Sequence, residues 1–147
     1  MIQISCNARA NQSPKNYERE FCVSDGRSSK RSLRPQEYVL NQHNQPYVPP
    51  LGLERLQNKA ACLEYIRKNT NIPVPDVLEA YDETGSLVLV TKLLPGVQMN
   101  ELSPDDQEVV MQEVDEHIRT LQTLRSDQTG GPSRIVCPPR RVTEYFP

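Results

Sequence analysis

The clearest pattern along the chain is an apolar stripe between residues 52 and 69. Its members recur at steps of three and four: Leu53, Leu56, Ala60, Leu63 and Ile66 or Arg67. This spacing predicts an amphipathic helix from about Gly52 to Asn69. Pro73 and Pro75 follow directly, and they forbid continuation of the helix and force an extended path.

Two strands are predicted after these prolines. Val74–Tyr81 and Ser86–Leu94 flank the turn Asp82–Gly85, in which the glycine can supply a positive φ. The run Leu87–Val90 is apolar without alternation, which is typical of a strand buried on both faces. The short connection predicts an antiparallel hairpin. Tyr38–Leu40 is a further short strand candidate.

A second helix is predicted from Ser103, a good N-cap. Pro104 suits the first helical position, and Asp105 and Asp106 favour the positive end of the helix. The helix should end near residues 125–127, before Gly130. Its expected core-facing stripe is Val110, Val114, His117 or Ile118, Leu121 and Leu124 or Arg125.

The flanks are polar. Residues 1–32 are predicted to be a disordered tail, and residues 128–147 an irregular C-terminal tail. The basic cluster of residues 27–34 could touch phosphates, but a solvated, flexible tail is the preferred interpretation. Its members are Arg27, Lys30, Arg31 and Arg34.

Composition gives no reason to expect nucleic acid or an anionic membrane surface as a partner, because the formal net charge is only -2. The four cysteines show no CxxC spacing, no apolar run approaches a membrane span, and the N-terminus does not resemble a signal peptide. We therefore expect a cytoplasmic protein with free thiols.

The order of motifs resembles a known family. A helix is followed by Ile72–Pro75, by a strand, turn and strand, and by an exit through Leu94–Gly96, and later by Gly130–Ser133 and a pair of prolines. This order resembles the aminoglycoside phosphotransferase family, especially its fungal members. The resemblance implies an α+β, partial protein-kinase-like fold: a small antiparallel sheet with one packed helix, followed by a second long helix. Residues 33–100 would be the partial small lobe, and residues 101–127 the first helix of the large lobe.

The family transfers a phosphoryl group from ATP to a small-molecule hydroxyl with the help of magnesium. The resemblance implies that the Lys92 carbonyl and the Leu94 N–H would contact adenine, with Thr91 at the back of the pocket. An ordinary strand end leading into a linker is an equally acceptable interpretation of these three residues.

Other parts of the family's chemistry are missing. Lys59 occupies the position where the family often has a glutamate that pairs with a strand lysine. That lysine was expected in the strand Tyr38–Leu40 or near Asn41, and none is present there. No Gly-rich phosphate loop precedes the first helix, and neither His43 nor His117 begins a His-x-Asp catalytic loop. We therefore expect no catalytic residue, no metal ligand and no tightly held cofactor.

Two hypotheses remain open. The chain is expected to be a truncated member of this family that lacks the catalytic loop and the magnesium ligands and is inactive alone, with a nucleotide as its ligand. Alternatively, it is a non-catalytic protein-interaction module that binds a partner or self-associates through an exposed apolar face, or it is an incomplete gene product derived from that family with no function of its own.

Overall fold

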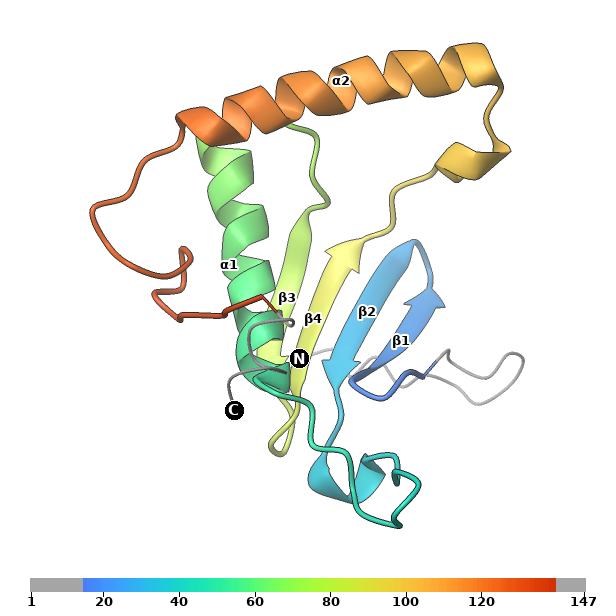
Figure 1. Cartoon of the computed structure of the whole chain (residues 1–147), viewed down its shortest axis with the longest axis vertical. Helices are drawn as coiled ribbons and strands as arrows, with labels where there is room; N and C mark the ends of the chain where they lie inside the picture. Colours follow the sequence, from blue (N-terminus) through green and yellow to red (C-terminus); the bar gives the residue numbers. More distant parts are fainter. Residues whose placement is uncertain (1–14, 140–147) are drawn as a thin grey trace.

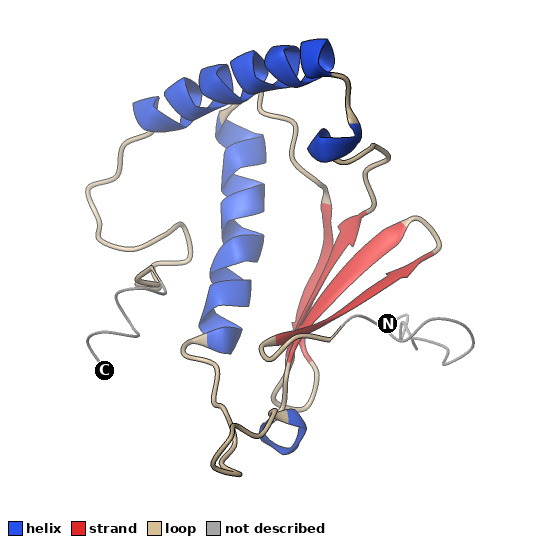
Figure 2. Cartoon of the chain, turned by 45° about the vertical axis from the view of Figure 1, so that its right-hand side comes forward, coloured by secondary structure: helices blue, strands red, loops and turns tan. Residues whose placement is uncertain are grey.

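Helix α1 (Gly52–Asn69) begins and ends where the sequence predicts. The computed structural model describes residues 15–139, in which α1 packs against one face of an antiparallel sheet (Figures 1 and 2). Leu56 and Ala60 on α1 meet Leu89 of the sheet in a small buried core, with Val77 and Leu87 packed around it. The architecture is α+β, as predicted.

The sheet has four strands within the described residues, in the order β1-β2-β4-β3. The strands are β1 (Arg19–Ser24), β2 (Arg27–Ser32), β3 (Val77–Asp82) and β4 (Leu87–Lys92). The predicted antiparallel hairpin of β3 and β4 is confirmed. Val88, Leu89 and Val90 are 7%, 1% and 0% exposed, so consecutive side chains of β4 are buried on both faces, as the unbroken apolar run indicated.

The β1–β2 hairpin corrects the prediction that residues 1–32 are disordered, which is wrong for the two strands between Arg19 and Ser32; residues 1–14 lie outside the described part. Asp25 and Gly26 form its two-residue turn, with φ values of 50° and 72°. Asp-Gly favours such a turn because both central residues need positive φ. The polar composition concealed these strands.

Two further expectations are wrong. Tyr38–Leu40 forms no strand, and only an isolated bridge joins Leu40 to Pro46, because the surrounding prolines remove ladder donors. Cys22 in β1 is disulfide-bonded, which overturns the expectation of a free thiol there. Spacing in sequence cannot show which cysteines the fold brings together.

Helix α2 (Pro104–Thr123) is confirmed, together with its N-cap: the Asp106 N–H donates to Ser103 Oγ at 3.2 Å. We expected one side of α2 to pack in the core, but α2 has no buried residue. Figures 1 and 2 show the helix extending across the C-terminal end of α1 with much of its surface uncovered. No helix within residues 15–139 is long and apolar enough to cross a membrane.

Candidate functional site

The sheet face that α1 covers brings together the polar groups of greatest interest. Lys30 is the register partner of Leu89, and Ser28 is the partner of Thr91. Because side chains alternate along a strand, Lys30 and Thr91 belong to the same face as Leu89, which packs against α1. Lys30 and Thr91 therefore lie about 7 Å apart along the strand direction. Thr91 is one of the predicted adenine-site residues.

Lys59 of α1 faces this point. Its side chain lies close enough to Lys30 to be affected by it, and the pKa of Lys59 is lowered from 10.5 to about 8. The largest cause is burial, followed by the hydrogen bond to Lys30 and by the positive charges of Lys30 and Arg19. Two ammonium groups can only donate, so the two lysines share a hydrogen bond only when one of them has lost its proton. When both lysines are protonated, their ammonium groups repel each other.

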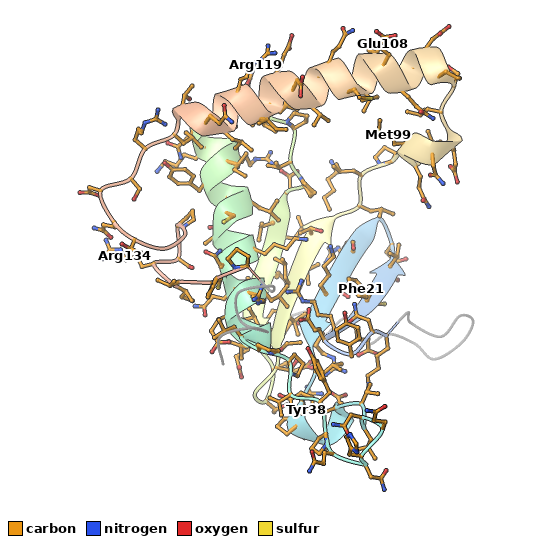
Figure 3. All side chains as sticks on the ribbon, viewed as in Figure 1. Phe21, Tyr38, Met99, Glu108, Arg119 and Arg134 are labelled. Carbon is orange, nitrogen blue, oxygen red and sulfur yellow. The ribbon has the colours of Figure 1, made fainter. Side chains whose placement is uncertain are left out.

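Lys30 has a second neighbour on the edge strand. Its Nζ lies 5.7 Å from the centroid of the Phe21 ring, a distance at which the ring face attracts a cation. Figure 3 shows Phe21 beside the sheet. Lys30 therefore has an aromatic ring on one side in addition to Lys59 of α1.

The position of Lys30 corrects one part of the sequence argument. A strand lysine was expected near Tyr38–Leu40, and its absence there suggested that the helix residue had no strand partner. The structure instead provides the partner from β2, in the segment that had been assigned to a flexible tail. The substitution of a lysine for the expected glutamate at position 59 therefore places two like charges opposite each other.

The three predicted adenine-site residues lie at and after the end of β4. Thr91 Oγ1 donates to the Ser28 carbonyl at 3.3 Å, and the Lys92 N–H donates to the Asp76 carbonyl at 2.9 Å. Leu94 is 52% exposed, and no described residue accepts a hydrogen bond from its N–H. The Leu94 donor is thus open to a ligand acceptor, and the hydrogen bond from Lys92 to Asp76 uses the Lys92 N–H, not the carbonyl that was expected to contact adenine.

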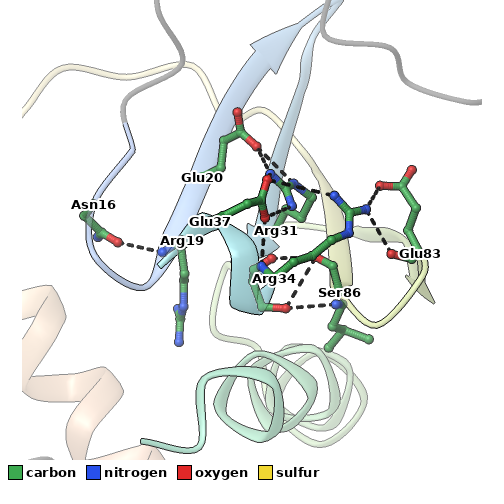
Figure 4. Close-up of polar contacts among 10 residues, drawn as sticks. Asn16, Arg19, Glu20, Arg31, Arg34, Glu37, Glu83 and Ser86 are labelled. Atoms are coloured by element: carbon green, nitrogen blue, oxygen red, sulfur yellow. Dashed lines mark hydrogen bonds and ion pairs between the residues drawn. The ribbon is translucent and has the colours of Figure 1, made fainter. Parts of the chain in front are cut away.

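The opposite region of the sheet holds an ion-pair network (Figure 4). Arg31 pairs with Glu20, and its guanidinium binds both oxygens of Glu37 at 2.7 and 2.8 Å. Arg34 Nη2 contacts Glu83 Oε2 at 2.8 Å. These contacts overturn the interpretation of residues 27–34 as a solvated, flexible tail: at least two of its arginines are held by carboxylates.

The Arg31–Glu37 contact perturbs both groups. Its hydrogen bonds lower the pKa of Glu37 from 4.5 to about 2, against the opposing effect of burial. The pKa of Arg31 is raised, chiefly by the hydrogen bond to Glu37. Both groups are charged at neutral pH and neutralise each other, so the network is structural.

A shallow cavity of about 170 Å³ adjoins this network, and Glu20, Arg31, Tyr81 and Val88 are among the residues that line it. None of the three predicted adenine-site residues contributes to it. Its charged groups already have partners, which leaves the Lys30–Lys59 pair as the better candidate for a ligand. Within residues 15–139, no group of three or more His, Cys, Asp or Glu side chains is arranged to hold a metal ion.

No family model matches the chain, and neither a curated protein nor a solved structure matches it.

Sequence reasoning named Lys59 but missed its partner. The Asp25–Gly26 dipeptide was the available signal: a two-residue hairpin turn would have made strands of the residues on either side. With that strand in place, Lys30 would have been identified as a residue that can face the helix.

Proposed function

We propose that this chain is a kinase-like small lobe that binds the phosphates of a nucleotide without transferring a phosphoryl group. The observation that carries the proposal is the Lys30–Lys59 pair on the α1-facing side of the sheet. A phosphate placed between the two ammonium groups would convert their repulsion into charge-assisted hydrogen bonds. The resemblance to the aminoglycoside phosphotransferase family motivates the choice of a nucleotide.

The arrangement of elements supports this choice. The helix that precedes the β3–β4 hairpin packs on the same sheet as that hairpin, as the resemblance implies. The Leu94 N–H follows the last strand and has no acceptor among the described residues. An adenine ring could accept a hydrogen bond from this N–H. Thr91 would then lie behind the ring, on the face shared with Lys30.

Catalysis requires more than this site offers. Phosphoryl transfer depends on positioned cations, a base and metal ligands that stabilise charge in the transition state. Here Lys59 stands where the resemblance implies a glutamate, and we assign no described residue as a base. We assign no magnesium ligands either, since no suitable donor cluster occurs in residues 15–139, and we derive no step through magnesium.

Calorimetric titration of the full chain with ATP and with adenosine, both without magnesium, tests the proposal. Loss of a charge-assisted hydrogen bond costs about 1.5–3 kcal/mol, so Lys59→Met should weaken ATP binding roughly tenfold or more and leave adenosine binding unchanged. Leu94→Pro, which removes the N–H, should weaken both ligands, whereas Val97→Pro serves as the backbone control. Equal affinity of the wild type for ATP and adenosine would contradict phosphate binding at the lysines.

The absence of catalysis is tested separately. We expect no conversion of ATP to ADP above that of a mock preparation, with magnesium present and at high protein concentration. Turnover that copurifies with the chain and is lost in Lys30→Met would show that the site is an active one.

A second candidate function is self-association through α2. Met111, Val114, Ile118 and Leu121 recur at steps of three and four along one side and are 60%, 47%, 46% and 39% exposed. Such a stripe usually packs against another element. Size-exclusion chromatography with light scattering should show a dimer that Ile118→Glu converts to monomer, with Glu113→Gln on the polar side as the control. A monomer at high concentration would exclude this function.

A further inference from the structure

The exposed stripe of α2 has the spacing of a coiled-coil seam. Met111, Val114, Ile118 and Leu121 follow one another at steps of three, four and three residues. At this spacing the side chains of two helices interlock along a common line. All four side chains are exposed, Leu121 the least at 39%, so no element of residues 15–139 covers the seam.

The charges along α2 are divided between its two halves. Residues 105–116 carry carboxylates and no basic side chain, whereas residues 117–125 carry two arginines and no carboxylate. The carboxylates are Asp105, Asp106, Glu108, Glu113, Asp115 and Glu116, and the arginines are Arg119 and Arg125. All of these residues are exposed, and no ion pair within residues 15–139 involves α2. Figure 3 shows Glu108 and Arg119 toward opposite ends of the helix.

This division of charge distinguishes the two directions in which a second α2 could lie along the seam. A parallel pair places the acidic half of one helix beside the acidic half of the other, where like charges repel. An antiparallel pair places each acidic half beside a basic half. Charge complementarity therefore favours a second copy of this chain in the antiparallel direction.

We propose that two copies of this chain pair through α2 with the helices antiparallel. The inference rests on the self-association proposed above and adds its direction and register. A two-fold axis that crosses the pair level with Glu116 places Met111 against Leu121 of the second copy, and Val114 against Ile118. Both layers are apolar, so the whole seam is covered, and the interface is the same patch on both copies.

The flank of the seam supplies opposite charges in this register. Asp115 and Arg119 are four residues apart and lie on the same side of the helix. The two-fold axis places this side of one helix beside the same side of the other. Arg119 is then level with Glu113 of the second copy, and Asp115 of that copy lies two residues, about 3 Å, further along the axis. Each Arg119 can therefore pair with Asp115 of the other copy.

The first test is cross-linking of the full chain through two introduced cysteines, Met111→Cys and Leu121→Cys, carried on separate chains. Oxidation with copper phenanthroline, followed by non-reducing peptide mapping, identifies the linked positions. We expect a 111–121 cross-link between chains when the two variants are mixed. Neither variant alone should link to itself, because in the proposed pair the two copies of residue 111 lie ten residues, about 15 Å, apart along the axis.

The outcomes separate the direction from the self-association itself. A wild-type chain that stays monomeric at high concentration in size-exclusion chromatography with light scattering excludes both. A dimer in which Met111→Cys alone links 111 to 111 retains the self-association and overturns only the antiparallel direction. A dimer whose mixture yields no 111–121 link overturns the register.

The second test exchanges the charges. Asp115→Arg and Arg119→Asp should each weaken dimerisation several-fold in sedimentation velocity, because each places like charges together, and the double variant should restore it. Glu116→Arg, on the side of α2 away from the seam, is the control and should have little effect. Circular dichroism establishes that each variant is folded. Unchanged dimerisation in both single variants would show that these charges do not determine the direction.

Discussion

Replacing Lys59 by methionine should stabilise the protein, although it removes a charged side chain from a helix. Burial and the nearby Lys30 lower the pKa of Lys59 from 10.5 to about 8, so the folded state disfavours its charge. At about 1.4 kcal/mol for each pKa unit this corresponds to roughly 3 kcal/mol. Solvent screening of a half-buried group reduces the expected gain to about 1–2 kcal/mol. Methionine retains most of the apolar contact of the lysine stem.

The dependence on pH follows from the same shift. Below pH 8 both folded and unfolded chains carry the Lys59 proton, and the penalty is complete. Between pH 8 and 10.5 the folded chain releases the proton while the unfolded chain keeps it, so the penalty fades; above 10.5 it is absent. The advantage of Lys59→Met should therefore be full at pH 7 and vanish near pH 11.

Urea unfolding followed by far-ultraviolet circular dichroism measures this, since the chain has no tryptophan. Lys68→Met is the matched control, because Lys68 is an exposed lysine of the same helix and its loss should change the free energy of unfolding by no more than about 0.5 kcal/mol. If Lys59→Met is no more stable than Lys68→Met at pH 7, or if its gain persists at pH 11, the two lysines do not repel each other as described.

Three further substitutions test other parts of the structure. Glu37→Gln should cost about 1–2 kcal/mol at pH 7; because the Glu37 pKa is held at about 2, wild type should lose this advantage as the pH falls from 4.5 to 2, as acid titrations would show. Ser103→Ala removes the acceptor of the Asp106 N–H and should lower the free energy of unfolding by about 1 kcal/mol in urea titrations; no loss would mean that the cap is dispensable. Gly26→Ala places a Cβ at φ 72° and should cost about 1 kcal/mol, with Gly96→Ala as a thermal-denaturation control.

The helices could be predicted because local rules determine them. The apolar period and the following prolines gave the bounds of α1, and a serine cap followed by proline gave the start of α2. The fate of the α2 stripe was not predictable, because periodicity shows that a helix has an apolar side but not that another element covers it.

The β1–β2 hairpin escaped prediction because its strands carry mostly polar and charged side chains. Arg31 of β2 pairs with Glu20 of β1 and with Glu37 beyond the strand, and β2 is hydrogen-bonded to β4 on its other side. Hydropathy alone therefore assigned it to a disordered tail. The candidate site was therefore predicted only in part: Lys59 was recognised, but Lys30 was not placed on a strand.

The pairing of β2 with β4 determines the order in which the chain can assemble. Ser86 Oγ donates to the Ser32 carbonyl at 2.5 Å, and these residues lie 54 positions apart; both are almost fully buried. Helix α1 and the β3–β4 hairpin are close in sequence and can meet early, whereas β2 must close a long loop before this contact forms. We therefore expect Lys59 to meet the like charge of Lys30 only when β2 docks on β4.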